Sequence, residues 1–87
     1  MEHWRIFESD PCRKAIAENV IPRRLLWMGS QQSFAFEFQY MPNTDKERAK
    51  AIASKFLIEA YDARAIKFFK NKEQTDDKFY ATFDFGK

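Results

Sequence analysis

The sequence contains few of the residues from which small-molecule and metal sites are built. Its 87 residues include two glycines, one cysteine and one histidine. With only Gly29 and Gly86, no glycine-rich loop is available to cradle a phosphate group. The single cysteine, Cys12, excludes an internal disulfide and favours a reducing compartment, so we expect a cytoplasmic protein. His3 stands alone, without the cysteines, histidines or closely spaced carboxylates that a metal site needs.

Long hydrophobic runs and a strong net charge are absent as well. No apolar segment approaches the length of a membrane span, and residues 1–4 do not resemble a signal peptide, so we expect no membrane partner. The formal net charge of +2 permits binding to nucleic acid or to an acidic protein but demands neither. We therefore expect no cofactor, no metal and no catalytic activity. An enzyme such as a small nuclease that uses Glu8 or Asp10 is the catalytic alternative.

The chain is rich in aromatic residues, with ten phenylalanines and a hydrophobic fraction of 45%. Its length fits a single domain with one core. The most informative segment runs from Ser33 to Met41, where aromatic and other side chains alternate strictly: Phe34, Phe36, Phe38 and Tyr40 are separated by Ala35, Glu37 and Gln39. Side chains alternate between the two sides of a strand, so this pattern predicts a strand with one apolar and one polar face. We interpret the aromatic face as the core.

Turn and cap residues place the other elements. Asp10 and Pro11 predict the N-cap and first turn of a helix that ends before Pro22. Thr44 and Glu47 form a capping box for a second helix that runs to about residue 60. The inner side of that helix is predicted to carry Ala49, Ile52, Ala53, Phe56, Leu57 and Ala60. Further strands are predicted at residues 4–7, 23–28, 63–70 and 79–85, and we find no sequence repeat.

These elements predict an α+β domain with a four- to five-stranded antiparallel sheet and two helices packed on one face. With a strand at residues 4–7, the order is β-α-β-β-α-β plus a C-terminal strand, which resembles a ferredoxin-like layer. Without that strand, the order is α-β-β-α-β-β.

The order of elements also suits an RNA-recognition motif, and Phe34-Ala35-Phe36 matches part of its aromatic signature. In that family the aromatic side chains face RNA and the opposite side of the strand packs on the helices. Here that would bury Glu37 and Gln39 in the core at a cost of a few kcal/mol. We therefore reject base stacking by Phe34 and Phe36.

Cys12 is predicted to lie in the first turn of a helix beside Arg13 and Lys14, where dipole and charge would lower the pKa of a thiol. A small buried hydrophobic residue is the commoner role of a free cysteine, and we interpret Cys12 in that way. Asp76 and Asp77 lie in a predicted polar loop and are interpreted as a solvated turn rather than a cation site.

Apolar and cationic residues remain outside the predicted core. If Leu26 and Met28 point inward, then Trp27 points outward, and Tyr80 lies on the polar side of the last strand. Tryptophan, tyrosine and arginine are the residue types that anchor protein interfaces. The predicted partner-binding residues are Trp27, Tyr80, Arg23, Arg24, Ile58 and Lys55.

These features predict a small non-enzymatic protein that binds and blocks a larger protein or nucleoprotein complex. The chain resembles small phage or mobile-element inhibitors of host defence, such as anti-CRISPR proteins, in its size, its aromatic core and its lack of an active site. No motif carries this resemblance, which implies a steric mechanism. The alternative is a nucleic-acid-binding module whose basic patch contains Arg13, Lys14, Arg23, Arg24 and Lys67. A homodimer, formed through a free edge of the last strand or through the Ile58 face, is a third candidate.

Overall fold

The computed structural model describes residues 8–27, 34–69 and 77–85. The elements are α1 (Asp10–Ala17), β1 (Val20–Trp27), β2 (Phe34–Tyr40), α2 (Lys46–Tyr61), β3 (Arg64–Phe69) and β4 (Lys78–Asp84). This α+β arrangement confirms the predicted fold class, with the order α-β-β-α-β-β in the described part of the chain. The strand predicted at residues 4–7 lies outside the described residues.

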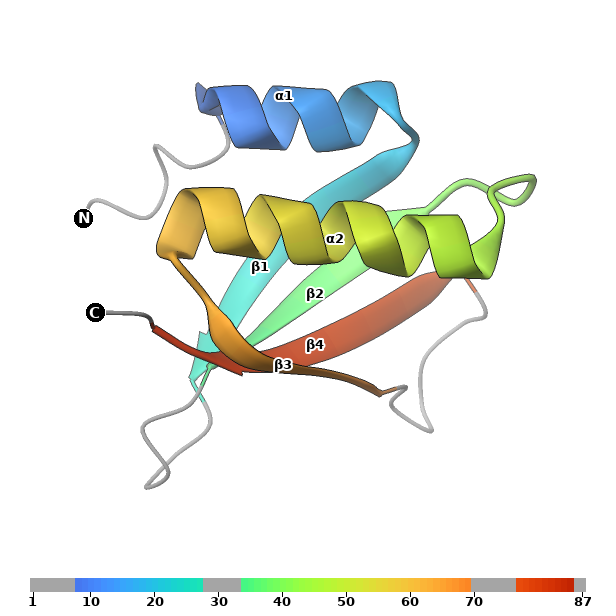
Figure 1. Ribbon diagram of the computed structural model, residues 1–87. Coiled ribbons are helices and arrows are strands. Elements are labelled where there is room, and N and C mark those ends of the chain that lie inside the picture. Colours follow the sequence, from blue (N-terminus) through green and yellow to red (C-terminus); the bar gives the residue numbers. More distant parts are fainter. Residues whose placement is uncertain (1–7, 28–33, 70–76, 86–87) are drawn as a thin grey trace.

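The four strands form one antiparallel sheet in the order β1-β2-β4-β3. Both helices lie on the same side of this sheet, side by side and in opposite directions (Figure 1). We call the helix-covered side the inner face and the opposite side the outer face. Because β4 lies between β2 and β3, the prediction that the last strand offers a free edge is wrong. The edges of the described sheet are β1 and β3.

The aromatic residues of β2 and β4 supply the core between the sheet and the helices. Phe36 and Phe38 have no exposed surface, and Phe83 is 1% exposed. They pack against Phe56 of α2, whose ring meets those of Phe36 and Phe38 edge to face. The predicted direction of the aromatic face is therefore confirmed. Residues from all six elements pack in or against this one cluster.

Cys12 of α1 also lies in the core with no exposed surface. Burial raises the pKa of its thiol, and the neighbouring Arg13 opposes this only in part. The side chain is therefore a small buried hydrophobic group, as predicted from the sequence.

The helix ends differ from the prediction by one to a few residues. The N-caps are Ser9 and Asp45, where Asp10 and Thr44 were predicted. Each side chain accepts a hydrogen bond from the backbone N–H three residues later in the chain. Helix α1 ends at Ala17 because Asn19 takes up a left-handed conformation with φ of 69°. The predicted end at Pro22 is wrong, since the proline lies inside β1, where an edge strand tolerates it.

Both edge strands contain an irregularity. In β1 the register shifts between Pro22 and Arg24, which leaves Arg23 as an extra, exposed residue. In β3 the register shifts between Arg64 and Lys67. The shift in β1 reverses the side on which the following residues lie, so Leu25 packs against the core and Leu26 lies opposite Ala35. The predicted inward position of Leu26 is therefore wrong.

Candidate partner-binding surface

One row of side chains crosses the outer face of the sheet from edge to edge. The register aligns Arg24 of β1 with Glu37 of β2, Glu37 with Tyr80 of β4, and Tyr80 with Phe69 of β3. We call these four residues the outer row. They lie on the side away from the helices, because Phe36, Phe38 and Phe79 beside them in the sequence point into the core.

Glu37 is the centre of the outer row and is 6% exposed. One carboxylate oxygen, Oε1, lies 3.3 Å from Nε of Arg24, and the other, Oε2, accepts a hydrogen bond of 2.5 Å from the hydroxyl of Tyr80. A buried carboxylate without partners would carry a large desolvation penalty. Here the Arg24 guanidinium from one neighbouring strand and the Tyr80 hydroxyl from the other each interact with one of its two oxygens. These contacts offset the cost of burying the Glu37 carboxylate.

Tyr80 lies on the outer face, as predicted, but it is not the exposed anchor that the sequence suggested. It is 3% exposed, and its ring stacks on that of Phe69 with centroids 5.5 Å apart. Burial, together with the hydrogen bond to the Glu37 carboxylate, raises the pKa of the Tyr80 hydroxyl to about 12. The phenol is therefore a fixed hydrogen-bond donor that holds Glu37, and its neighbours cover its ring.

The two ends of the outer row are exposed. The Arg24 side chain is 63% exposed although it pairs with Glu37. At the other edge, Phe69 is 39% exposed although its ring stacks on Tyr80. The outer row thus presents one guanidinium and one aromatic ring, and each is held in place by a buried neighbour.

The rest of the outer face is less exposed to solvent than the alternation of polar residues in β2 suggested. Ala35 is only 1% exposed, and Leu26, which is opposite it on β1, is half-buried. Gln39 is also half-buried and donates a hydrogen bond of 2.8 Å to the carboxylate of Asp77. Alternation correctly assigned these residues to a face but could not give their exposure, which depends on the neighbouring strands.

Trp27, the first predicted anchor, lies at the end of β1 with its backbone opposite Phe34. Its predicted outward position assumed an inward Leu26, and this premise is wrong because the bulge at Arg23 places Leu26 opposite Ala35. Its side chain lies outside the described part of the structure, so its role in binding stays a prediction.

The predicted residues on the helices lie on the opposite side of the molecule from the outer row. Ile58 is exposed on α2, as predicted. Lys55 and Lys14 line a groove of about 370 Å³ between the two helices, and Glu18 and Glu59 line the same groove. Arg48 of α2 and Glu18 form an ion pair that joins the helix layer. The groove therefore carries mixed charge.

The five cations of the alternative nucleic-acid site do not form one patch. Arg24 and Lys67 lie on the outer face, since Lys67 pairs with Thr82 of β4. Lys14 lines the groove between the helices, and Arg13 of α1 pairs with Asp10 at 3.5 Å. The two sets are separated by the thickness of the sheet and the core.

Within residues 8–27, 34–69 and 77–85, no group of three or more histidine, cysteine, aspartate or glutamate side chains is placed to hold a metal ion. In the same residues, no helix combines the length and the apolar character needed to cross a membrane.

A scan against protein-family models, a search of curated proteins and a search of solved structures found no match to this chain.

Proposed function

We propose that this chain is a small protein-binding domain that acts without catalysis, by occupying a surface of a larger protein partner with its outer sheet face. Such a domain would block whatever the covered surface normally contacts, as do the small inhibitors of host defence that it resembles in size. We place this action in the cytoplasm, because the single cysteine forms no disulfide within the chain and is buried.

The observation that supports this proposal is the outer row. Arginine and aromatic residues are enriched among the residues that dominate interface energies. Arg24 and Phe69 are exposed while Glu37 and Tyr80 fix their positions. A partner would therefore lose little free energy to ordering these side chains on binding. Trp27 is left out of this surface, because its predicted outward position depended on an inward Leu26, which the register contradicts.

Binding to nucleic acid is supported less well, because the cations predicted for it are divided between two sides of the molecule. Arg24 and Lys67 lie on the outer face, Arg13 and Lys14 lie on the helix side, and Arg24 is already paired with a carboxylate. Two cations can neutralise only about two phosphates, so they would contribute a weak affinity.

The test is capture of the partner from lysate of the source organism, with each bound protein quantified by mass spectrometry. The test variant is the double variant Arg24→Gln/Phe69→Ala, in which glutamine keeps a hydrogen-bond donor next to Glu37. The matched control is Lys55→Ala/Ile58→Ala on the helix layer. We expect the sheet-face variant to bind the partner with an affinity about thirtyfold lower. This factor corresponds to the loss of a hot spot of about 2 kcal/mol. We expect the control to retain it.

Equal recovery by both variants would contradict the proposal, and loss with the control variant alone would move the interface to the helices. Recovery that disappears after nuclease treatment or falls steeply with salt would favour nucleic acid. Circular dichroism and thermal unfolding of both variants show whether a loss of binding reflects a loss of fold.

A further inference from the structure

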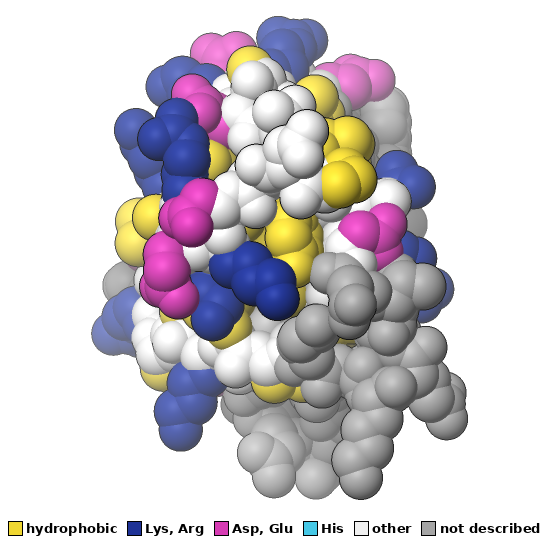
Figure 2. Space-filling view, turned by 90° about the vertical axis from the view of Figure 1, so that its right-hand side faces the viewer, with side chains coloured by type: hydrophobic (Ala, Val, Ile, Leu, Met, Phe, Trp, Pro, Cys, Tyr) yellow, Lys and Arg dark blue, Asp and Glu magenta, His cyan; other side chains and the backbone are white. Residues whose placement is uncertain are grey.

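A second recess lies on the inner side of the sheet, at the end of the molecule where α2 begins. It has a volume of about 210 Å³ and opens between the first turns of α2 and the strands β3 and β4. Its lining is Tyr40, Lys46, Ala49, Lys50, Phe68, Phe69 and Phe79. In the space-filling view of this end of the molecule, dark-blue cationic side chains border patches of yellow (Figure 2). We call this recess the α2–β3 pocket.

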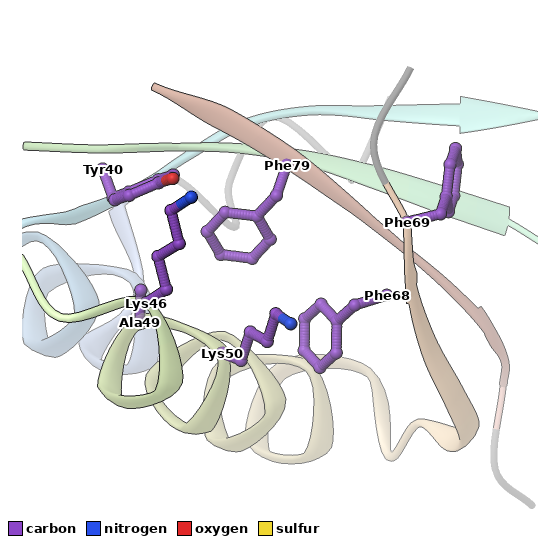
Figure 3. A pocket seen from close by; sticks show the side chains of 7 residues that line it. All are labelled: Tyr40, Lys46, Ala49, Lys50, Phe68, Phe69 and Phe79. Carbon is purple, nitrogen blue, oxygen red and sulfur yellow. The ribbon is translucent and has the colours of Figure 1, made fainter. Parts of the chain in front are cut away.

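Aromatic rings form the floor and one wall of the α2–β3 pocket. The ring of Phe79 lies 5.4 Å from that of Tyr40 and 5.6 Å from that of Phe68, measured between centroids. Phe79 and Tyr40 are almost fully buried, so their positions are set by the core, and Phe68 is half-buried at the rim. Phe69 contributes to the rim while its ring turns to the other side of β3, towards the outer row (Figure 3).

The helix side of the pocket combines one small residue with two cations. Ala49 is 1% exposed, and its short side chain leaves the space that a larger residue would fill. Lys46 and Lys50 are one helical turn apart, so both reach the pocket from the same side of α2. In Figure 3, Lys46 extends towards Tyr40 and Lys50 towards the ring of Phe68.

The charge at the mouth of the pocket is not balanced by its lining. None of the seven lining residues that the structure describes is acidic. Among the described residues, neither Lys46 nor Lys50 takes part in an ion pair. The groove between the helices differs in this respect, because Glu18 and Glu59 line it together with its cations.

We propose that the α2–β3 pocket binds a small amphipathic carboxylate, with one ring or a short alkyl chain on the aromatic floor and its carboxylate at Lys46 and Lys50. The volume is below the range of about 300–1,000 Å³ typical of drug-sized ligands, so the apolar part is limited to about one ring. The aromatic lining favours the ring, and the two ammonium groups favour an anion over a neutral or cationic group. The pocket shares only Phe69 with the outer row, and the ring of Phe69 turns away from the pocket (Figure 3), so the inference does not depend on the proposed function.

The test is an NMR titration of the full-length, ¹⁵N-labelled protein with 3-phenylpropionate, and in parallel with the neutral 3-phenylpropionamide. We expect saturable shifts of the amide signals of the lining residues, with a Kd in the millimolar range, as the small number of ligand atoms implies. The neutral probe should bind about three- to tenfold more weakly, because two exposed charge pairs contribute modestly.

The double variant Lys46→Gln/Lys50→Gln should weaken binding of the carboxylate by the same factor and leave that of the amide unchanged. The matched control Lys55→Gln/Lys67→Gln removes the same charge elsewhere and should leave both affinities unchanged. Four outcomes would overturn the proposal: no saturation, equal affinity for the two probes, shifts centred outside the lining residues, or an equal loss in the control variant. A native-like amide spectrum of each variant shows that it is folded.

Discussion

Glu37 illustrates how a residue in an alternating strand can have a role that its position alone does not show. It lies on the polar side of β2, where a charged residue is expected to face water. It is instead 6% exposed, with Arg24 on one side and the hydroxyl of Tyr80 on the other. These three side chains therefore form a connected group that spans three strands of the outer face in the absence of a partner.

The Tyr80 hydroxyl should make the protein sensitive to alkaline pH. Its pKa is raised from 10 in an unfolded chain to about 12 in the folded protein, mainly by burial and then by Glu37. The unfolded chain therefore releases this proton first as the pH rises. The stabilisation is fully present below pH 10 and is lost as the pH rises towards 12. We expect the free energy of unfolding, measured by urea denaturation, to fall through this window.

Tyr80→Phe should remove this contribution, so its free energy of unfolding should fall less steeply between pH 10 and 12 than that of the wild type. At neutral pH the same variant should be less stable by about 1–2 kcal/mol, because the Glu37 carboxylate loses a hydrogen bond. Tyr61→Phe provides a comparison, since burial also raises the pKa of Tyr61 to about 12. It should flatten the alkaline decline without affecting Glu37. An unchanged alkaline slope in Tyr80→Phe would contradict the burial of this phenol.

At the scale of the elements, the sequence predicted the strands and helices well and their ends less well. The strict alternation in β2 and β4 and the 3–4 spacing in α2 identified the core residues, because those patterns report directly which side is buried. The bulge at Arg23 could not be foreseen, since nothing in Pro22-Arg23-Arg24 distinguishes a bulge from a regular edge strand. The outer row depends on the pairing of strands far apart in sequence, which alternation within one strand does not specify.

The N-cap of α2 gives a sharp test at this scale, because two neighbouring residues are both suitable caps. The carboxylate of Asp45 accepts a hydrogen bond of 3.0 Å from the backbone N–H of Arg48. The hydroxyl of Thr44 is buried and has no hydrogen-bond partner among the described atoms. We expect Asp45→Ala to lower the free energy of unfolding by about 1 kcal/mol. We expect Thr44→Val to leave it unchanged or to raise it slightly, because no hydrogen bond is lost. If urea denaturation shows that Thr44→Val destabilises the protein more than Asp45→Ala does, then Thr44 is the N-cap, as the capping box predicted.

At the scale of the whole molecule, the described elements form two units of the same order, α1-β1-β2 and α2-β3-β4, which meet where β2 pairs with β4. Both helices are followed by a residue with positive φ, Asn19 or Asp62, and then by a buried residue, Val20 or Ala63. Both edge strands carry a register shift. We found no repeat in the sequence, because the two units share backbone geometry while their residues differ. The similarity therefore became visible only in three dimensions.

This symmetry places an irregular strand at each edge of the described sheet, and such edges disfavour pairing with another copy. β1 carries Pro22 and the bulge at Arg23, and β3 carries its own bulge with exposed Arg64 and Lys67. Proline, bulges and charged side chains are the features that prevent edge-to-edge association. We expect sedimentation equilibrium at high micromolar concentration to give a mass near the 10.4 kDa of one chain. A dimer that Ile58→Asp dissociates would place self-association on the helix layer, whereas a dimer unaffected by that variant would show that these edges pair despite their irregularities.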